Sequence, residues 1–231
     1  MATLVLTADR NWQRNLMRAR PRWRGGWVLG LSLGDAVDPA GLEPLCATAA
    51  GEWNVPGRDQ TLRIDRAPVT WARYLPFIEA GGYAEEQWWT PEGWAWRHSQ
   101  GLQRPRYLSL AEDDTWQRAR FGQWQPLQAD APVMHVSGHE AQAWCRWAGR
   151  RLPTAAEWLA AIQQAPHDGE ALAWGQVWEW TADAAPQDAS HTLTLRGASF
   201  ATHALLRQPS GQLDLPADRN DQFSGFRSCA V

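Results

Sequence analysis

Two histidines four residues apart, His135 and His139, are followed directly by an acidic residue, Glu140. Imidazoles at this spacing bind a metal ion together when both lie on one turn of a helix. Ser137 lies between them, however, and is expected to cap a helix that begins at the next residue. His135 would then precede the helix, and the two imidazoles need not share a face. We therefore expect this pair to bind no metal.

The chain has three cysteines, Cys46, Cys145 and Cys229. Their number is odd, their spacing is wide and no Cys-x-x-Cys occurs, so neither a zinc site nor a disulfide framework is indicated. Cys145 lies among alanines and tryptophans and is predicted to be a buried thiol. Cys229 lies two residues from the end and is predicted to be partly exposed.

The composition is that of a globular protein. The chain has 231 residues, 44% of them hydrophobic, which suits one large domain or one domain with an arm. The formal net charge is only -3, so neither nucleic acid nor a membrane surface is implied as a partner. No apolar run approaches membrane-spanning length, and the first residues lack the features of a signal peptide. A cytoplasmic location is the expectation.

Two residue types are used unevenly. Tryptophan occurs 17 times, and all 22 basic residues are arginine. Arginine pairs bidentately with carboxylates and stacks on aromatic rings, which lysine does not do in the same way. A domain rich in loops could be held together by such contacts.

The first fifty residues are predicted to form an arm that packs on the main domain. Residues 8–20 indicate a short helix with arginines at four-residue spacing, and residues 30–50 indicate a second helical region. A basic arm of this kind could contact a partner or nucleic acid, but a solvated helix face packed by its tryptophans is the simpler interpretation. We therefore divide the chain into an arm, residues 1–50, and a main domain, residues 51–231.

The main domain alternates predicted helices and strands. Residues 60–66 alternate apolar and polar side chains as a strand does. Helices are expected from Thr70 to the glycines at 81 and 82, over 138–148, and after Thr154, where Glu157 completes a capping box. Short strands are expected at 171–181 and 192–200. The tryptophan-rich stretch 83–131 is predicted to be a long irregular segment.

Four segments in the C-terminal half occur in a specific order. They are Arg151–Trp158 (RLPTAAEW), Val177–Thr181 (VWEWT), Leu195–His203 (LRGASFATH) and Phe223–Arg227 (FSGFR). Together they resemble the formylglycine-generating enzyme or sulfatase-modifying factor superfamily, and within it the C-terminal domain of ergothioneine-type sulfoxide synthases. The resemblance spans roughly residues 50–230. It implies an α+β, C-type-lectin-like fold with extensive irregular loops.

The resemblance also suggests substrate-binding residues. Counted back from Phe226, the arginine that contacts the thiol substrate in the family corresponds to Arg219, and the aspartate corresponds to Asp214 if one residue is inserted. An arginine can hold a carboxylate and an aspartate can pair with an ammonium group. His203 follows a segment that lines the pocket in related proteins. For Asp214 and Arg219 the alternative is a pair of surface charges, and for His203 it is ordinary packing.

Metal and proton-donor positions of the family are missing. Segment 200–207 has no cysteine, so the copper-dependent formylglycine oxidase activity is not expected. The iron motif of the synthases, His-x-x-x-His-x-Glu, would need an acid at position 141, which is Ala141, and belongs to a separate helical bundle. The family's proton-donor tyrosine is also absent, since the last tyrosine is Tyr107. Related oxidases hold structural calcium on a loop that is largely missing here, so calcium is not expected.

Three functions remain open at this stage. The first is the substrate-shaping half of a non-haem iron sulfoxide synthase, which joins a small thiol to a histidine-derived ring. An iron-bearing helical-bundle partner would complete this enzyme. The second is a non-catalytic module that binds a ligand or protein on the same fold. A self-contained formylglycine-generating oxidase is a distant third.

Overall fold

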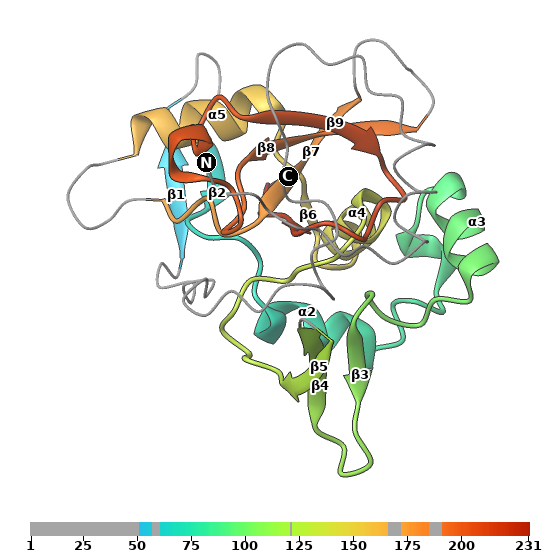
Figure 1. Cartoon of the computed structure of the whole chain (residues 1–231). Coiled ribbons are helices and arrows are strands. Elements are labelled where there is room, and N and C mark those ends of the chain that lie inside the picture. The colour runs from blue at the N-terminus through green and yellow to red at the C-terminus, as the bar shows by residue number, and fades with distance from the viewer. Residues whose placement is uncertain (1–50, 57–60, 121, 166–171, 185–190) are drawn as a thin grey trace.

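The computed structural model describes residues 51–56, 61–120, 122–165, 172–184 and 191–231 (Figure 1). The predicted arm and its two helices lie outside these ranges. Within them, none of the helices is long and apolar enough to cross a membrane.

Among the described residues, three small sheets form the framework. The first has the strand order β1-β2-β11-β6, the second β10-β7-β8-β9 and the third β3-β4-β5. All neighbours in these sheets are antiparallel except β10 and β7, which are parallel. The strands are β1 (Glu52–Val55), β2 (Leu62–Asp65), β3 (Leu108–Leu110), β4 (Trp116–Arg120), β5 (Gln123–Pro126), β6 (Arg150–Arg151), β7 (Trp178–Ala184), β8 (Thr192–Gly197), β9 (Gln212–Pro216), β10 (Ser224–Gly225) and β11 (Cys229–Ala230).

Helices alternate with these strands along the described chain, and the mixed arrangement confirms the predicted α+β class. They are α2 (Trp71–Glu79), α3 (Pro91–Gln100), α4 (Gly138–Trp147) and α5 (Ala155–Gln164), with 3-10 turns η1 (Glu86–Trp88) and η2 (Ala204–Leu206). Capping boxes begin α4 at Ser137 and α5 at Thr154. Thr70 precedes α2 as predicted, but its side chain makes no capping hydrogen bond.

The prediction of an irregular segment at 83–131 was wrong. The segment contains α3 and the whole third sheet, which projects at the bottom of Figure 1. Thr90 accepts a hydrogen bond from the Gly93 amide (2.9 Å), Pro91 begins α3, and Gly101 ends it in the left-handed conformation. These are ordinary helix boundaries, and the many tryptophans between them obscured the pattern.

The core is aromatic and lies between α2, α4 and the second sheet. Tyr74 and Phe77, on α2, make edge-on ring contacts with each other, and Tyr74 contacts Phe226 at 6.2 Å between ring centroids. Trp144 of α4 meets the same Phe226 at 5.4 Å. Such contacts stabilise the fold beyond the area they bury, so many of the tryptophans act as scaffold.

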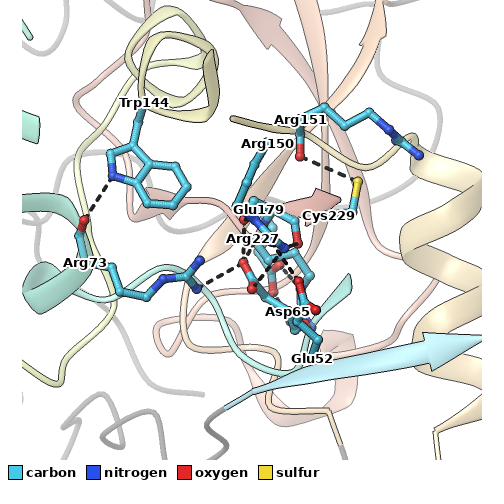
Figure 2. A network of polar contacts seen from close by, with 10 residues as sticks. Glu52, Asp65, Arg73, Trp144, Arg150, Arg151, Glu179, Arg227 and Cys229 are labelled. Carbon is cyan, nitrogen blue, oxygen red and sulfur yellow. Dashed lines mark hydrogen bonds and ion pairs between the residues drawn. The ribbon is translucent and has the colours of Figure 1, made fainter. Parts of the chain in front are cut away.

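A buried ion pair ties the second sheet to the C-terminal segment (Figure 2). Glu179 accepts hydrogen bonds from Arg227 Nε (2.5 Å) and Nη2 (2.8 Å), and both side chains are 0% exposed. Trp158 Nε1 donates a third hydrogen bond to Glu179, at 2.9 Å. A lone buried carboxylate would be costly, and the guanidinium and the indole N–H compensate this one.

The first sheet carries a second polar network, beside that pair in Figure 2. Asp65 accepts hydrogen bonds from the Ser228 hydroxyl (2.6 Å) and amide (3.0 Å), and Arg150 bridges Glu52 and Asp65. Cys145 is buried, as predicted. The prediction of a partly exposed Cys229 was wrong: its residue is 0% exposed, because β11 pairs with β2 on one side and β6 on the other.

Candidate functional site

The segment that follows β9 is held against the N-terminus of α4. The amide of His139 donates to the carbonyl of Ala217 at 3.3 Å, and Phe223 O accepts from the Trp178 amide at 2.9 Å. Residues 217–223 are therefore fixed at both ends. This segment carries Arg219, which the resemblance assigns to substrate binding.

Arg219 is already engaged by an acid of the same segment. Its Nε and Nη2 each donate to one carboxylate oxygen of Asp221, both at 2.8 Å. The two side chains keep 24% and 16% of their surface exposed, so the pair is neither fully buried nor freely solvated. A bidentate arginine–carboxylate pair is among the stronger polar contacts in proteins. A substrate carboxylate would have to compete with Asp221 for this guanidinium.

His135 is held beside this pair in an uncommon conformation. Its φ of 62° lies in the left-handed region, and its ring packs between Tyr107 (4.8 Å between centroids) and Phe223 (5.4 Å). Tyr107 also has a positive φ, 63°. Such backbone is strained for bulky residues and is often found at functional sites. Two strained residues in ring contact therefore mark this place as a candidate site.

The imidazole of His135 is neutral at physiological pH. Burial lowers its pKa from 6.5 to about 3, and the charges of Arg118 and Arg106 lower it further, whereas Asp221 and a backbone hydrogen bond to Gln222 oppose the shift. The buried Nδ1 atom has no hydrogen-bond partner. A neutral imidazole with a free nitrogen can exchange a hydrogen bond with a ligand.

Two arginines complete the group: Arg106, just before β3, and Arg118 on β4. Arg106 Cζ lies 4.9 Å from the centre of the Tyr107 ring, a cation–π contact. Arg118 on β4 is paired with the buried Leu108 on β3, so both side chains point to the same face of the sheet. We call Arg106, Tyr107, Arg118, His135 and the Arg219–Asp221 pair the His135 group.

The other two predicted site residues have partners elsewhere. Asp214, exposed on β9, accepts hydrogen bonds from Thr194 Oγ1 (2.7 Å) and from Gln212 (3.1 Å). His203 is exposed, and its Nδ1 accepts from the Leu205 amide at 3.3 Å. No hydrogen bond or ion pair among the described residues joins Asp214, His203 and Arg219 to one another. Their roles in substrate binding stay predictions.

The two histidines of the sequence motif have different surroundings. His135 precedes α4 and faces Tyr107 and Phe223, whereas His139 lies in the first turn of α4 with its ring 5.6 Å from that of Trp96. Across the described ranges, no three histidine, cysteine or acidic residues gather closely enough to hold a metal ion. The described residues therefore do not fit the iron that the family resemblance implies.

The sequence pointed to part of this group. Arg219 was found from its distance to the C-terminal anchors. Tyr107, Arg118 and Asp221 were missed as site residues, although Asp221 lies only two residues beyond Arg219. The short spacing between Arg219 and Asp221 could have indicated their pairing. The left-handed backbone of Tyr107 and the strand register of Arg118 could not be predicted from the sequence.

The fold and the site together define a class of protein. It is a loop-rich α+β domain with an aromatic core and an arginine-rich group whose backbone is strained at Tyr107 and His135. Residues 54–176, more than half of the 231-residue chain, match the family profile "Sulfatase-modifying factor enzyme 1-like domain". The chain belongs to this family. This confirms the resemblance, and with it the predicted C-type-lectin-like arrangement of that family.

Within this family, the chain is similar to curated proteins named hercynine oxygenase. "Hercynine oxygenase" of Mycolicibacterium smegmatis is 43% identical over 51% of this chain and 27% of its own length. That of Mycolicibacterium thermoresistibile is 40% identical over 62% of this chain and 29% of its own length. The chain thus spans less than a third of these relatives.

The chain is also similar, at lower identity, to a mouse protein and to one solved structure. "Inactive C-alpha-formylglycine-generating enzyme 2" of Mus musculus is 32% identical over 67% of this chain and 56% of that protein. The solved structure of PvdO from Pseudomonas aeruginosa is 13% identical, covers 78% of this chain and 91% of that one, and has a TM-score of 0.46.

Proposed function

We propose that this chain is the substrate-shaping part of a sulfoxide-synthase-like enzyme that joins a small thiol to a histidine-derived ring with oxygen. The observation that carries the proposal is the 40–43% identity to hercynine oxygenases over about half the chain or more. The family profile and those matches already support a domain of the sulfatase-modifying-factor family that is related to ergothioneine-pathway oxidases. The predicted cytoplasmic location stays a prediction.

The part played by this chain's own residues is binding and orientation. We assign the carboxylate end of the thiol substrate to Arg219 and its ammonium group to Asp214, with His203 at the edge of the site. The exposed Asp214 carboxylate supports this assignment, since a substrate can reach it. Arg219 would exchange Asp221 for the substrate.

The oxidative chemistry would come from iron held by a partner. Within the described ranges no three residues are grouped to hold a metal. In the overall reaction, dioxygen accepts four electrons as one C–S and one S–O bond form, and its second oxygen leaves as water. We therefore propose an iron-binding helical-bundle protein or domain as the partner.

A second function is supported by a specific observation. The bidentate Asp221 already neutralises Arg219, and one relative of this chain is named as inactive. Both favour a non-catalytic module that binds a ligand or protein on this fold.

Two measurements test the proposal. The first is iron content by mass spectrometry after anaerobic reconstitution of the purified chain, where we expect no stoichiometric iron. The second is calorimetric titration with γ-glutamylcysteine and cysteine, where we expect binding that Asp214→Asn weakens. A matched control is Asp113→Asn, which removes an exposed carboxylate from the turn that joins β3 and β4. If neither thiol bound, with or without the partner, the enzymatic proposal would be abandoned; tight iron would place the metal site in this chain.

A further inference from the structure

Arg118 is a guanidinium on the covered face of the third sheet. Its strand partner Leu108 is 5% exposed, so the Arg118 side chain lies on the face that packs against the domain. Burial lowers the pKa of Arg118 to about 10, and the charge of the neighbouring Arg120 contributes to the shift. No acidic side chain of the described residues forms an ion pair with Arg118. A partly buried cation without a counter-ion is costly, unless a ligand supplies the charge.

The surroundings of Arg118 have further unused binding capacity. The Tyr107 carbonyl accepts from the Ala119 amide at 2.8 Å, so Tyr107 lies directly beside the β4 position of Arg118. The Tyr107 ring contacts the imidazole of His135, whose buried Nδ1 has no partner. Arg106, stacked on Tyr107, likewise has no acidic partner among the described residues.

The charge balance of the His135 group is positive. It contains three arginines and one carboxylate, and that carboxylate is bound bidentately by Arg219. The guanidinium that the family resemblance assigns to a substrate carboxylate is therefore occupied, whereas two other guanidinium groups nearby are not. An anion at this place would complete the balance.

We propose that Arg118, with Arg106 beside it, forms a second carboxylate-binding subsite of this chain, in addition to the one assigned to Arg219, over the Tyr107–His135 ring pair. The ligand class is a small amino-acid-like molecule. Arginine matches a carboxylate in plane and charge. The free His135 Nδ1 can accept a hydrogen bond from the ligand's ammonium group. The assignment of a thiol substrate to this subsite rests on the proposed function. The binding of a carboxylate there does not depend on that function.

The test is calorimetric titration of the full chain with glutamate, which has carboxylates but no thiol, and with γ-glutamylcysteine. We expect Arg118→Gln to weaken both by about 10- to 100-fold, the loss typical of a charge-assisted hydrogen bond. Arg219→Gln should weaken them less, because Asp221 holds that side chain. Arg63→Gln is the matched control: it removes an equal charge from the first sheet, where Arg63 is 61% exposed and pairs with Glu52.

A second readout separates binding from folding. The ring signals of His135 in NMR spectra should move when glutamate is added to the wild type, and should stay fixed in Arg118→Gln. Circular dichroism of each variant shows whether it is folded; if Arg118→Gln is not, Arg118→Lys takes its place, with charge retained and bidentate geometry lost.

The outcomes separate this subsite from the proposed function. Glutamate binding that depends on Arg118 supports the subsite even if the thiol adds no affinity, in which case the synthase proposal fails alone. Absence of carboxylate binding by the folded wild type, or equal losses in Arg118→Gln and Arg63→Gln, overturns the subsite. Preference for inorganic phosphate over glutamate overturns the carboxylate assignment.

Discussion

The pairing of Glu179 with Arg227 shows how much a single residue contributes when its charge is buried. We expect Arg227→Met to lower the free energy of unfolding by about 3–5 kcal/mol, because Glu179 is left as an uncompensated buried charge. Urea denaturation followed by tryptophan fluorescence measures the loss. The double variant Glu179→Leu/Arg227→Met should recover part of it, since neither charge then remains.

The control for this pair lies on the surface. Arg63→Met removes the ion pair with Glu52, in which Arg63 is 61% exposed, and should cost less than about 1 kcal/mol. Equal losses at the two sites would contradict the view that burial, rather than the ion pair itself, sets the cost.

A second residue-scale prediction concerns His135 and pH. Its pKa falls from 6.5 in the unfolded chain to about 3 in the folded one, so the folded state binds fewer protons. The contribution of this group to stability is therefore present above pH 6.5 and is lost as the pH falls toward 3. We expect His135→Asn, which tolerates a positive φ, to flatten the loss of stability over this window.

The measurement is urea denaturation of both proteins at several pH values. The carboxylates titrate in both proteins, so the difference in slope isolates His135. Parallel curves would show that the imidazole is protonated freely in the folded protein.

At this scale the sequence allowed only part of the site to be predicted. The burial of Cys145 was predicted from its alanine and tryptophan neighbours. Cys229 was placed wrongly because nearness to the chain end does not show that a strand lies on either side of it. Tyr107 and His135 are strained, which no residue type reveals.

Among the elements, helices with their own boundary signals were the most predictable. The capping box at Thr154 and Glu157 was read directly from the sequence, because it satisfies the first amides of α5 locally. The third sheet was not predicted. β3 is only three residues long, and β5 is exposed along its length. Neither of these two strands therefore shows the alternation of apolar and polar residues that marks a half-buried strand.

The short strand β10 gives a prediction for one element. A Cβ added to Gly225 would overlap the backbone carbonyl oxygen of Val133 and lie 2.9 Å from Val177 Cγ2. The carbonyl cannot move aside without breaking local structure, so Gly225→Ala should lower stability by about 2–3 kcal/mol. Thermal unfolding followed by circular dichroism measures this.

Gly138→Ala is the matched comparison for Gly225. There the nearest atom to the added Cβ is Leu193 Cδ1, at 2.7 Å, which is the end of a flexible side chain. This side chain can rotate, so the loss should be clearly smaller. A larger loss at Gly138 than at Gly225 would show that the close approach of β10 to Val133 is not rigid.

At the scale of the whole molecule, the two ends of the described domain meet in one sheet. β1 and β2 come from its first residues, and β11 from its last, with β2 and β11 directly paired. The order of the C-terminal anchors allowed the family to be predicted, because it depends on several fixed positions together. The partners and the substrate could not be predicted in the same way, since they depend on loops that vary on a common fold.

This closure gives the last prediction. A chain that begins at residue 51 should unfold in one cooperative step, with a midpoint within a few degrees of the full chain, because the described residues from 51 onward form a four-stranded first sheet and an aromatic core among themselves. Differential scanning calorimetry of both chains measures the two midpoints. As a control, a chain that begins at residue 61 lacks β1 and the Glu52 partner of Arg150, and should lose stability. If the 51–231 chain unfolded without cooperativity, residues 1–50 would belong to the folding unit and the predicted division into arm and domain would be wrong.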